Sequence, residues 1–516
     1  MLFRNRLLRF TICLNLSLLG GCSRGPTEAD PTPVENRREG SPDWALSNPA
    51  TAGEIEGYAS ATSVRPGEML SLHVSTPSRG FDVRIYRLGW YGGAGARLMH
   101  EKTGIPGGLR ARPVPRPGDG LVACDWPASL TFRVGRRWAT GVYLARLTGR
   151  DDGKQAFIPF VVRESRGRRA PFLFPIAVAT WQAYNDWGGT SLYDFNSAGG
   201  RRALRVSFDR PYAAGAGAWA GLGAGELLTV AHAPRKAGWE YPMIRWLERE
   251  GYDVGYTTTI DLDADSTSTL ARRAVLVVGH DEYWTRAVRD RFEAARDRGV
   301  HLAFLGANIG YWQVRLEGSA RGLPRRTIFC AKDHTLDPVA DTNADRDLTV
   351  HFRHLHPRRP ENALIGVMTA EAEEPVEGAF APTPVGRASW VLAGTAAARE
   401  DSTPIPGIVG YEVDRSFGSE EFFGPWTPAG LEVLGRSPVR LRDGRSAWSE
   451  ATLYRAPSGA FVFAAGTVQW SWGLDDWGAP ALRPPVTHAD IRRITTNLMQ
   501  AFGRAPETSR IARSRR

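Results

Sequence analysis

Three ionisable side chains follow directly after an apolar segment, residues 274–278, which is rich in β-branched side chains. Such a segment indicates a strand buried on both faces, and ligands of open α/β sheets bind at the carboxyl ends of the strands. His280 and Glu282 lie two positions apart and can point the same way, whereas Asp281 should point away and cap the next helix. Histidine with a carboxylate suits a transition metal or acid–base catalysis.

The His-x-Glu pattern is weak evidence by itself, because a loop-capping histidine beside a surface ion pair gives the same pattern. Residues at the ends of other predicted strands strengthen the evidence for a site. Residues 180–185 follow a strand predicted over 172–179, Asn308 follows one over 301–305, and Gln469 follows one over 461–465. Parallel strands place all of these residues on one edge. Their convergence, and no single residue, favours a site.

Three tyrosines, Tyr184, Tyr193 and Tyr212, lie in or beside the glycine-rich segment after the first of these strands. A phenolate is a hard, anionic oxygen ligand that suits ferric iron, as in catalase. A tyrosine among tryptophans and glycines is more often a packing residue. Spacing alone therefore leaves both interpretations open.

Several enzyme classes lack their signatures here. The chain has no G-x-S-x-G motif, P-loop or H-E-x-x-H motif. Neither Cys124 nor Cys330 follows a predicted strand at a turn into a helix, which argues against thiol acyl transfer; the two could pair or stay as buried thiols. The net charge is +10, but no basic helix or finger indicates a nucleic-acid partner.

The elements around the site fall into two parts. Residues 50–165 alternate apolar and polar side chains over short strands separated by glycine and proline turns, which predicts an antiparallel, immunoglobulin-like β-sandwich. After a basic joint at 166–169, residues 170–505 alternate strands with helices, predicted over 241–250 and, after a cap at Thr285, up to about residue 298. This pattern predicts a doubly wound, mostly parallel α/β domain of the glutamine-amidotransferase-like type. A basic tail, 506–516, follows.

The start of the chain has the features of an export signal. Arginines precede an apolar segment, residues 10–19, that is too short to span a bilayer. The Leu-Gly-Gly-Cys sequence that ends at Cys22 resembles a bacterial lipobox, so we expect a signal peptide over 1–22, lipidation of Cys22 and a disordered tether over 23–49. The alternative is an ordinary signal peptide with an incidental cysteine. The predicted location is the cell envelope, at the outer membrane, facing the periplasm or the cell surface.

Several segments resemble the large (β) subunit of N,N-dimethylformamidase and its relatives. The resemblance covers most of residues 50–501 and rests on motifs longer than His-x-Glu. The motifs are Tyr86 to Gly93, Thr180 to Asn185, Asp209 to Tyr212, Gly279 to Trp284 and Arg359 to Asn362.

The resemblance implies an amide hydrolase with a mononuclear iron (Fe³⁺) held by two tyrosines and a carboxylate, with a histidine nearby. By motif, the carboxylate is Glu282 and the histidine is His280, both with catalytic roles. The tyrosines are Tyr184 and Tyr212, with Tyr193 in competition for the second position. The chain departs from the enzyme by its lipoprotein signal, its short β-sandwich and the absence of a visible small subunit.

Two functions follow as expectations. The first is a lipid-anchored, metal-dependent hydrolase acting on a small amide. The second is a non-catalytic envelope lipoprotein that binds glycan or protein partners through the β-sandwich and its aromatic loops, a function for which the 17 tryptophans could supply aromatic platforms. Association into a homo-oligomer is left open.

Overall fold

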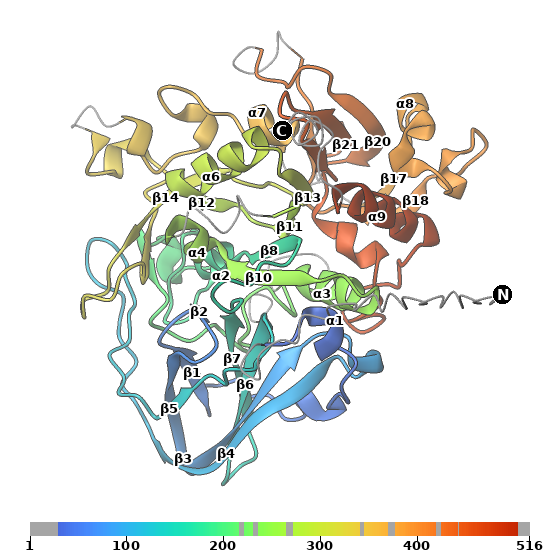
Figure 1. Ribbon diagram of the computed structural model, residues 1–516. Helices are drawn as coiled ribbons and strands as arrows, with labels where there is room; N and C mark the ends of the chain where they lie inside the picture. The colour runs from blue at the N-terminus through green and yellow to red at the C-terminus, as the bar shows by residue number, and fades with distance from the viewer. Residues whose placement is uncertain are drawn as a thin grey trace, which may run out of the picture.

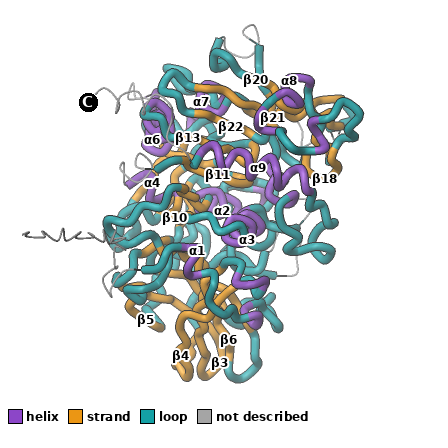
Figure 2. Tube along the Cα trace, turned by 45° about the vertical axis from the view of Figure 1, so that its right-hand side comes forward, coloured by secondary structure: helices purple, strands orange, loops and turns teal. Residues whose placement is uncertain are grey.

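The computed structural model describes residues 29–215, 221–230, 236–264, 272–340, 345–369, 377–418, 425–441 and 443–503. They form a mixed α/β structure with several sheets, as Figures 1 and 2 show. This class confirms the coarse prediction, while the immunoglobulin-like and amidotransferase-like assignments stay predictions. The predicted signal peptide, Cys22 and the basic tail lie outside the described residues. No helix of the described part is long and apolar enough to cross a membrane.

The first large sheet has the strand order β1-β3-β6-β7-β2, and β4 and β5 also pair with β3. Its pairing is antiparallel except between β2 and β7. Two strands predicted separately, over 70–74 and 81–86, are parts of the single 20-residue strand β3. The strands are β1 (Glu56–Ala59), β2 (Ser63–Val64), β3 (Met69–Leu88), β4 (Ala96–Gly108), β5 (Leu130–Arg133), β6 (Gly141–Gly149) and β7 (Gln155–Val162).

The second large sheet has the strand order β10-β8-β11-β13-β22-β21-β20. The first five strands in this order pair in parallel with their neighbours, whereas β21 pairs antiparallel with both β22 and β20. Every residue of β8, β10, β11 and β13 is buried, as expected for strands covered on both faces. The strands are β8 (Phe172–Ile176), β10 (Val254–Thr258), β11 (Ala274–His280), β13 (His301–Ala307), β20 (Glu432–Arg440), β21 (Ser446–Arg455) and β22 (Phe461–Ala464).

The order of the parallel strands determines where a ligand can bind. The chain forms β8 first, adds β10 on one side of it, and then adds β11, β13 and β22 in turn on the other side. The winding therefore reverses between β8 and β11. Connections that leave neighbouring strands in opposite directions open a crevice outside their carboxyl ends. The segments that follow β8 and β11 both enter this crevice.

Helices connect and cover the parallel strands. Helix α6 (Arg286–Asp297) begins as predicted, because the Thr285 hydroxyl accepts a hydrogen bond from the amide of Val288 at 3.2 Å. Its buried Val288 and Phe292 lie one turn apart, and Phe292 stacks on Trp284 with ring centroids 4.5 Å apart. The other helices are α1 (Thr32–Glu35), α2 (Val178–Tyr184), α3 (Glu240–Arg249), α4 (Thr259–Ala264), α7 (Asn362–Ile365), α8 (Pro384–Ala388) and α9 (Ala489–Phe502).

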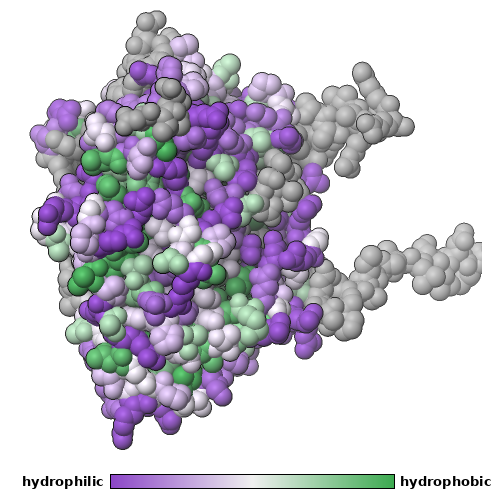
Figure 3. Space-filling model, turned by 90° about the vertical axis from the view of Figure 1, so that its left-hand side faces the viewer, coloured by the Kyte–Doolittle hydropathy of each residue, from purple (hydrophilic) through white to green (hydrophobic). Residues whose placement is uncertain are grey.

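Three smaller sheets complete the strands. One has the order β12-β14-β15-β9, and the others are the pairs β16–β19 and β17–β18. Their bounds are β9 (Arg205–Ser207), β12 (Tyr283–Thr285), β14 (Trp312–Glu317), β15 (Thr327–Phe329), β16 (Met368–Thr369), β17 (Gly378–Phe380), β18 (Ile405–Val409) and β19 (Asp414–Arg415). Figure 3 shows hydrophilic residues interspersed with apolar ones over the face that it presents.

The tether predicted for residues 23–49 does not extend over 29–49. Helix α1 lies beside α3 in Figure 1, and the Thr32 hydroxyl donates to the carbonyl of Val254 in β10 at 2.8 Å. Trp44 is buried against Tyr241, with ring centroids 5.5 Å apart. The polar composition suggested disorder, but a few buried anchors such as Thr32 and Trp44 are enough to fix this segment.

A buried ion pair joins the two large sheets. The guanidinium of Arg87, in β3, donates to both carboxylate oxygens of Glu248, in α3, at 2.8 and 2.9 Å, and neither side chain is exposed. Tyr256 also donates to Glu248 at 3.0 Å. A two-pronged, fully desolvated pair of this kind fixes the orientation of the parts that it joins.

We expect Arg87→Ala to lower the free energy of unfolding by about 3–5 kcal/mol, because it leaves the Glu248 carboxylate buried without its cation. Arg84→Ala, on the same strand, is the control. Arg84 is 41 % exposed and pairs with Glu101 at 2.6 Å, so its loss should cost about 1 kcal/mol or less. Urea denaturation at neutral pH measures both values, and equal losses would contradict this account.

Candidate functional site

The crevice between β8 and β11 brings together residues from two separate segments. Tyr184 is the last residue of α2, which follows β8 directly. His280 is the last residue of β11, and Glu282 lies in the short link between β11 and β12. The Thr180 hydroxyl in α2 accepts a hydrogen bond from the Glu282 amide at 3.0 Å, which ties the two segments together. The structure therefore brings Tyr184, His280 and Glu282 together at one edge of the sheet.

Glu282 is the centre of the site. The phenol of Tyr184 donates to Glu282 Oε2 at 2.9 Å, and the phenol of Tyr193 lies 2.9 Å from both carboxylate oxygens. Tyr283 donates to the Tyr193 phenol oxygen at 2.6 Å. The rings of Tyr184 and Tyr193 stack with centroids 4.3 Å apart. Two phenols thus converge on one carboxylate that is only 2 % exposed.

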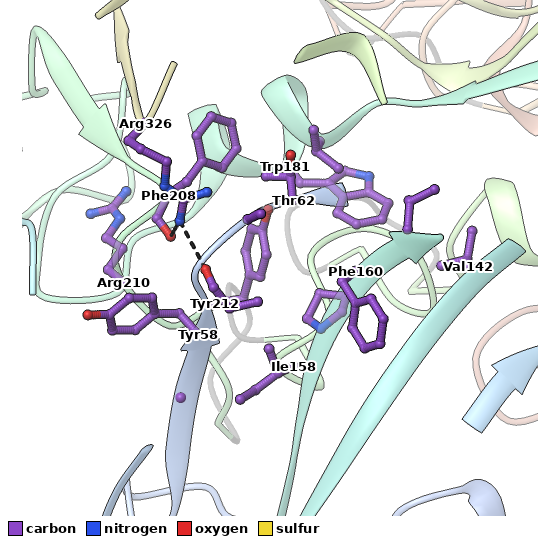
Figure 4. A pocket seen from close by; sticks show the side chains of 16 residues that line it. Tyr58, Thr62, Val142, Ile158, Phe160, Trp181, Phe208, Arg210, Tyr212 and Arg326 are labelled. Atoms are coloured by element: carbon purple, nitrogen blue, oxygen red, sulfur yellow. Dashed lines mark hydrogen bonds between the residues drawn. The ribbon is translucent and has the colours of Figure 1, made fainter. Parts of the chain in front are cut away.

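Tyr212, the sequence choice for the second tyrosine, lies in another place. Its ring packs edge-on against Trp181 with centroids 6.1 Å apart. Figure 4 shows it between Tyr58 and Trp181, at a small cavity of about 30 Å³ where the N-terminal sheet meets α2. No described hydrogen bond joins Tyr212 to Glu282. The structure brings Tyr193, the competing residue, to the carboxylate in its place.

His280 lies among three carboxylates. Its Nε2 is 3.3 Å from Glu282 Oε2 and 3.3 Å from Glu412 Oε2, and its Nδ1 is 3.6 Å from Glu226 Oε2. Burial works to lower the pKa of His280, but Glu412, Glu226 and Glu282 together raise that pKa well above its ordinary value. His280 is therefore an imidazolium when no other cation occupies the site.

The charges of the site keep both phenols protonated. Burial, and then the negative charge of Glu282, raise the pKa values of Tyr184 and Tyr193 well above the usual value for tyrosine. Burial also opposes ionisation of Glu282, but His280, Lys332 and the Tyr193 hydroxyl hold its pKa below the ordinary value. The site is thus a carboxylate surrounded by neutral hydroxyl donors and an imidazolium.

Lys332 covers the outer side of the site. Its Nζ lies 3.3 Å from the centroid of the Tyr193 ring and 4.8 Å from that of Trp312. Burial lowers the pKa of Lys332 to about 8. Lys332 and Trp312 also line a cavity of about 670 Å³, together with His351 and other residues. Through Lys332, this cavity lies next to the site.

The other predicted strand-end residues have different environments. The backbone amide of Asn308 donates to Asp414 at 3.0 Å, and no described contact joins Asn308 or Gln469 to Glu282. Asp281 was expected to cap α6, but the Thr285 side chain does so. Asp281 is buried, which raises its pKa to about 7.

Sequence reasoning missed several groups at the site. Glu412, Glu226 and Lys332 belong to no recognisable motif, and they reach Glu282 or His280 only through the tertiary fold. Tyr283 could have been found, because it directly follows Glu282 in the motif that carries the carboxylate. Cys124 and Cys330 are free, buried thiols with pKa values raised by burial to about 12, which removes the disulfide alternative.

Comparison with known protein families finds one match. The family model described as N,N-dimethylformamidase beta subunit-like, C-terminal, matches residues 82–484. Because this match covers most of the chain, the chain belongs to that family, as the sequence motifs predicted. It runs across the predicted boundary near residue 165 and includes all of the site residues. A search of curated proteins finds no match.

A buried acid beside the site gives a pH-dependent test. Glu240 accepts a hydrogen bond from the Trp181 indole at 3.0 Å, and burial, helped by Glu226, raises its pKa to about 8. Folding therefore keeps a proton that the unfolded chain releases above about pH 4.3. This carboxyl should lower the free energy of unfolding progressively as the pH rises from about 4.3 to 8.

We expect Glu240→Gln to stabilise the fold more at pH 8 than at pH 5, by roughly 3–4 kcal/mol, because glutamine has no proton to lose and keeps the acceptor for Trp181. Urea denaturation at both pH values measures the difference. Glu250→Gln is the control, since Glu250 is 42 % exposed at the end of the same helix. Parallel pH profiles for Glu240→Gln and the unmodified chain would refute the assignment.

Proposed function

We propose that this member of the N,N-dimethylformamidase beta subunit-like family hydrolyses the C–N bond of small amides with an iron ion held by Tyr184, Tyr193 and Glu282. Family membership supports a dimethylformamidase-like hydrolase. The observation that carries the metal proposal is that two phenol oxygens lie 2.9 Å from the same buried carboxylate. The amide itself, and the dependence on metal, are proposals.

The donor set fits a hard trivalent cation. Phenolate and carboxylate oxygens are hard, anionic donors of the kind that ferric iron binds in proteins. Among the described residues, no group of three or more His, Cys, Asp or Glu side chains is suited to hold a metal, so this site depends on its two phenols. A cation would replace the phenol protons that now point at Glu282, and its charge would favour the phenolates over the phenols.

The proposal assigns the second phenol to Tyr193 in place of Tyr212. Tyr193 donates directly to Glu282, whereas Tyr212 packs on Trp181. Motif reasoning preferred Tyr212 because it belongs to the Asp-Arg-Pro-Tyr segment. The guanidinium of Arg210 in that segment donates to the carbonyls of Trp187 and Asn185. The motif therefore has a structural role, bracing the loop that carries Tyr193.

A bound Fe³⁺ would act as a Lewis acid toward the amide carbonyl and would lower the pKa of an attacking water. The chain itself supplies the proton transfers. His280 Nε2 lies within 3.3 Å of both Glu282 and Glu412. Added positive charge beside Glu282 lowers the pKa of His280 toward neutrality, so that it can take a proton from the attacking water.

The second half of the reaction needs an acid. When the C–N bond breaks, its electron pair goes to nitrogen, and the departing amine requires a proton. The His280 imidazolium, held by Glu412 and Glu226, can return the proton that it took from water, so the overall reaction consumes one water and gives an acid and an amine. Lys332 and Trp312 line the cavity next to the site, through which we propose that the amide enters.

The cellular setting rests on residues outside the described part. We propose that Cys22 carries a lipid and anchors the protein in the cell envelope. The described chain begins at Ala29, close to α3, so few residues separate the proposed anchor from the folded body. The immunoglobulin-like and amidotransferase-like assignments are kept as proposals for the two large sheets.

The alternative of a non-catalytic glycan-binding lipoprotein receives less support. The exposed tryptophans among the described residues are Trp390, Trp426 and Trp448, which are 37–41 % exposed. All three lie in the C-terminal half, whereas binding was expected through the N-terminal sheet. In that part Trp44 and Trp126 are buried, and Trp90 and Trp138 are partly buried.

We expect the purified full chain to contain iron and to be coloured, because a ferric–phenolate group absorbs visible light by charge transfer. Glu282→Ala should lose the iron and the colour together, since it removes the carboxylate on which both phenols converge. Elemental analysis and visible absorption measure this. Glu250→Ala, which removes a carboxylate that is 42 % exposed and pairs with Arg249, is the control. Full iron content in Glu282→Ala would refute the ligand assignment.

Phenylalanine substitutions separate the two candidate tyrosines. Tyr193→Phe should lower the affinity for iron by about tenfold or more and weaken the visible band, because it removes a ligand oxygen. Tyr212→Phe should change neither, since this phenol has no described contact with Glu282. Titration of the metal-free chain with ferric ion measures both. Loss of iron from Tyr212→Phe alone would restore the motif-based assignment.

A further inference from the structure

The cavity beside Lys332 is larger than a small amide requires. It measures about 670 Å³, and pockets of about 300–1,000 Å³ enclose most of the surface of drug-sized ligands. N,N-Dimethylformamide, by contrast, carries nothing larger than methyl groups. Lys332 lies on the ring of Tyr193 and also lines the cavity, so an amide held at Glu282 can extend a substituent into it. The size of the cavity therefore indicates a substrate with one large substituent.

Trp312 connects the wall of this cavity to the site. It is the first residue of β14, lies opposite Tyr283 in the pairing of β14 with β12, and donates its backbone amide to the Glu282 carbonyl at 3.0 Å. The centroid of its ring is 4.8 Å from the Nζ of Lys332. Backbone pairing therefore sets the position of the indole relative to Glu282.

Aromatic rings make up much of the cavity wall. Trp312 is joined there by the imidazole rings of four histidines: His334, His351, His354 and His356. The ring of His351 packs against that of Trp312 with centroids 3.8 Å apart, and it stacks on Tyr311 at 3.9 Å. Burial lowers the pKa of His351 to about 3, so this imidazole is neutral near neutral pH. Leu348 and Val350 add aliphatic surface.

The charged side chains of the cavity favour neither an anionic nor a cationic substituent. Arg202 and Lys332 are matched in number by Asp333 and Asp345. Because the opposite charges balance, the ring and aliphatic surfaces decide what the cavity holds best. A planar, uncharged group fits this wall.

We propose that this cavity binds an aromatic substituent of the amide substrate, stacked on Trp312. Aromatic rings prefer offset-stacked or edge-on neighbours and gain more from such contacts than from burial of their area alone. The inference rests on the proposed function, because it names the class of amide, and it makes Trp312 a specificity-determining residue. The amide group reaches Glu282 past Lys332 while the ring occupies the cavity.

Three formamides test the substrate class. N-Benzylformamide and N-(cyclohexylmethyl)formamide have the same carbon skeleton with and without an aromatic ring, and N,N-dimethylformamide has no large substituent. Calorimetry measures their binding to the full chain in detergent after removal of the iron, and kcat/KM is measured on the iron-loaded chain. We expect N-benzylformamide to bind about threefold to tenfold more tightly than the cyclohexyl compound, and to have the highest kcat/KM.

The outcomes separate this inference from the proposed function. Failure of N-benzylformamide to bind, or binding no tighter than that of the cyclohexyl compound, overturns the inference. Hydrolysis of N,N-dimethylformamide with a kcat/KM equal to or above that of N-benzylformamide also overturns it, while the amidase proposal stands. Preferred binding of N-benzylformamide without hydrolysis of any of the three supports the aromatic cavity and refutes the amidase proposal.

Variants of Trp312 test the stacking itself. Trp312→Leu should weaken binding of N-benzylformamide by about threefold to tenfold, and Trp312→Phe, which keeps a ring, by about twofold or less. Trp390→Leu is the control, because Trp390 is 37 % exposed and does not line the cavity. Equal losses in Trp312→Leu and Trp312→Phe would contradict stacking. The comparison of the amides on the unmodified chain decides the question even if a variant fails to fold.

Discussion

The rest of the site depends on the burial of one carboxylate, that of Glu282. A charge that is 2 % exposed is costly unless hydrogen bonds or opposite charge compensate it. Here compensation comes from the phenols of Tyr184 and Tyr193, from the His280 imidazolium and from Lys332 nearby. The same arrangement brings together the three oxygen atoms that the proposed cation site requires. In that proposal, the contacts that hold the carboxylate in the fold also prepare it for a metal.

The sheet topology explains why these groups can meet at all. Tyr184 and Glu282 are far apart in the chain, but each follows a strand that ends at the reversal between β8 and β11. The loop with Tyr193 then closes over the crevice, and Lys332 lies on its ring. The strands place the carboxylate and histidine precisely, whereas the phenol of Tyr193 depends on how a long loop packs. This difference is the physical reason why sequence reasoning preferred Tyr212 to Tyr193.

The sequence predicted the parts of the fold that local pattern controls. Buried apolar strands such as β11, the Thr285 cap of α6 and the positions of His280 and Glu282 all follow from periodicity and turn chemistry. The family motifs added the Tyr184 assignment. Glu412 and Lys332 could not be predicted, because only long-range packing brings them to the site. The tether was overestimated, since composition does not reveal a single buried residue such as Trp44.

The N-terminal segment and the Arg87–Glu248 pair have a consequence for how the molecule comes apart. Trp44 packs against Tyr241, Thr32 binds β10, and Arg87 reaches from the first sheet to α3. Separating the halves would strip each of them of buried partners. Calorimetry of the intact chain should therefore show a single cooperative melting transition, in which the contacts around Glu282 are lost together with the N-terminal strands.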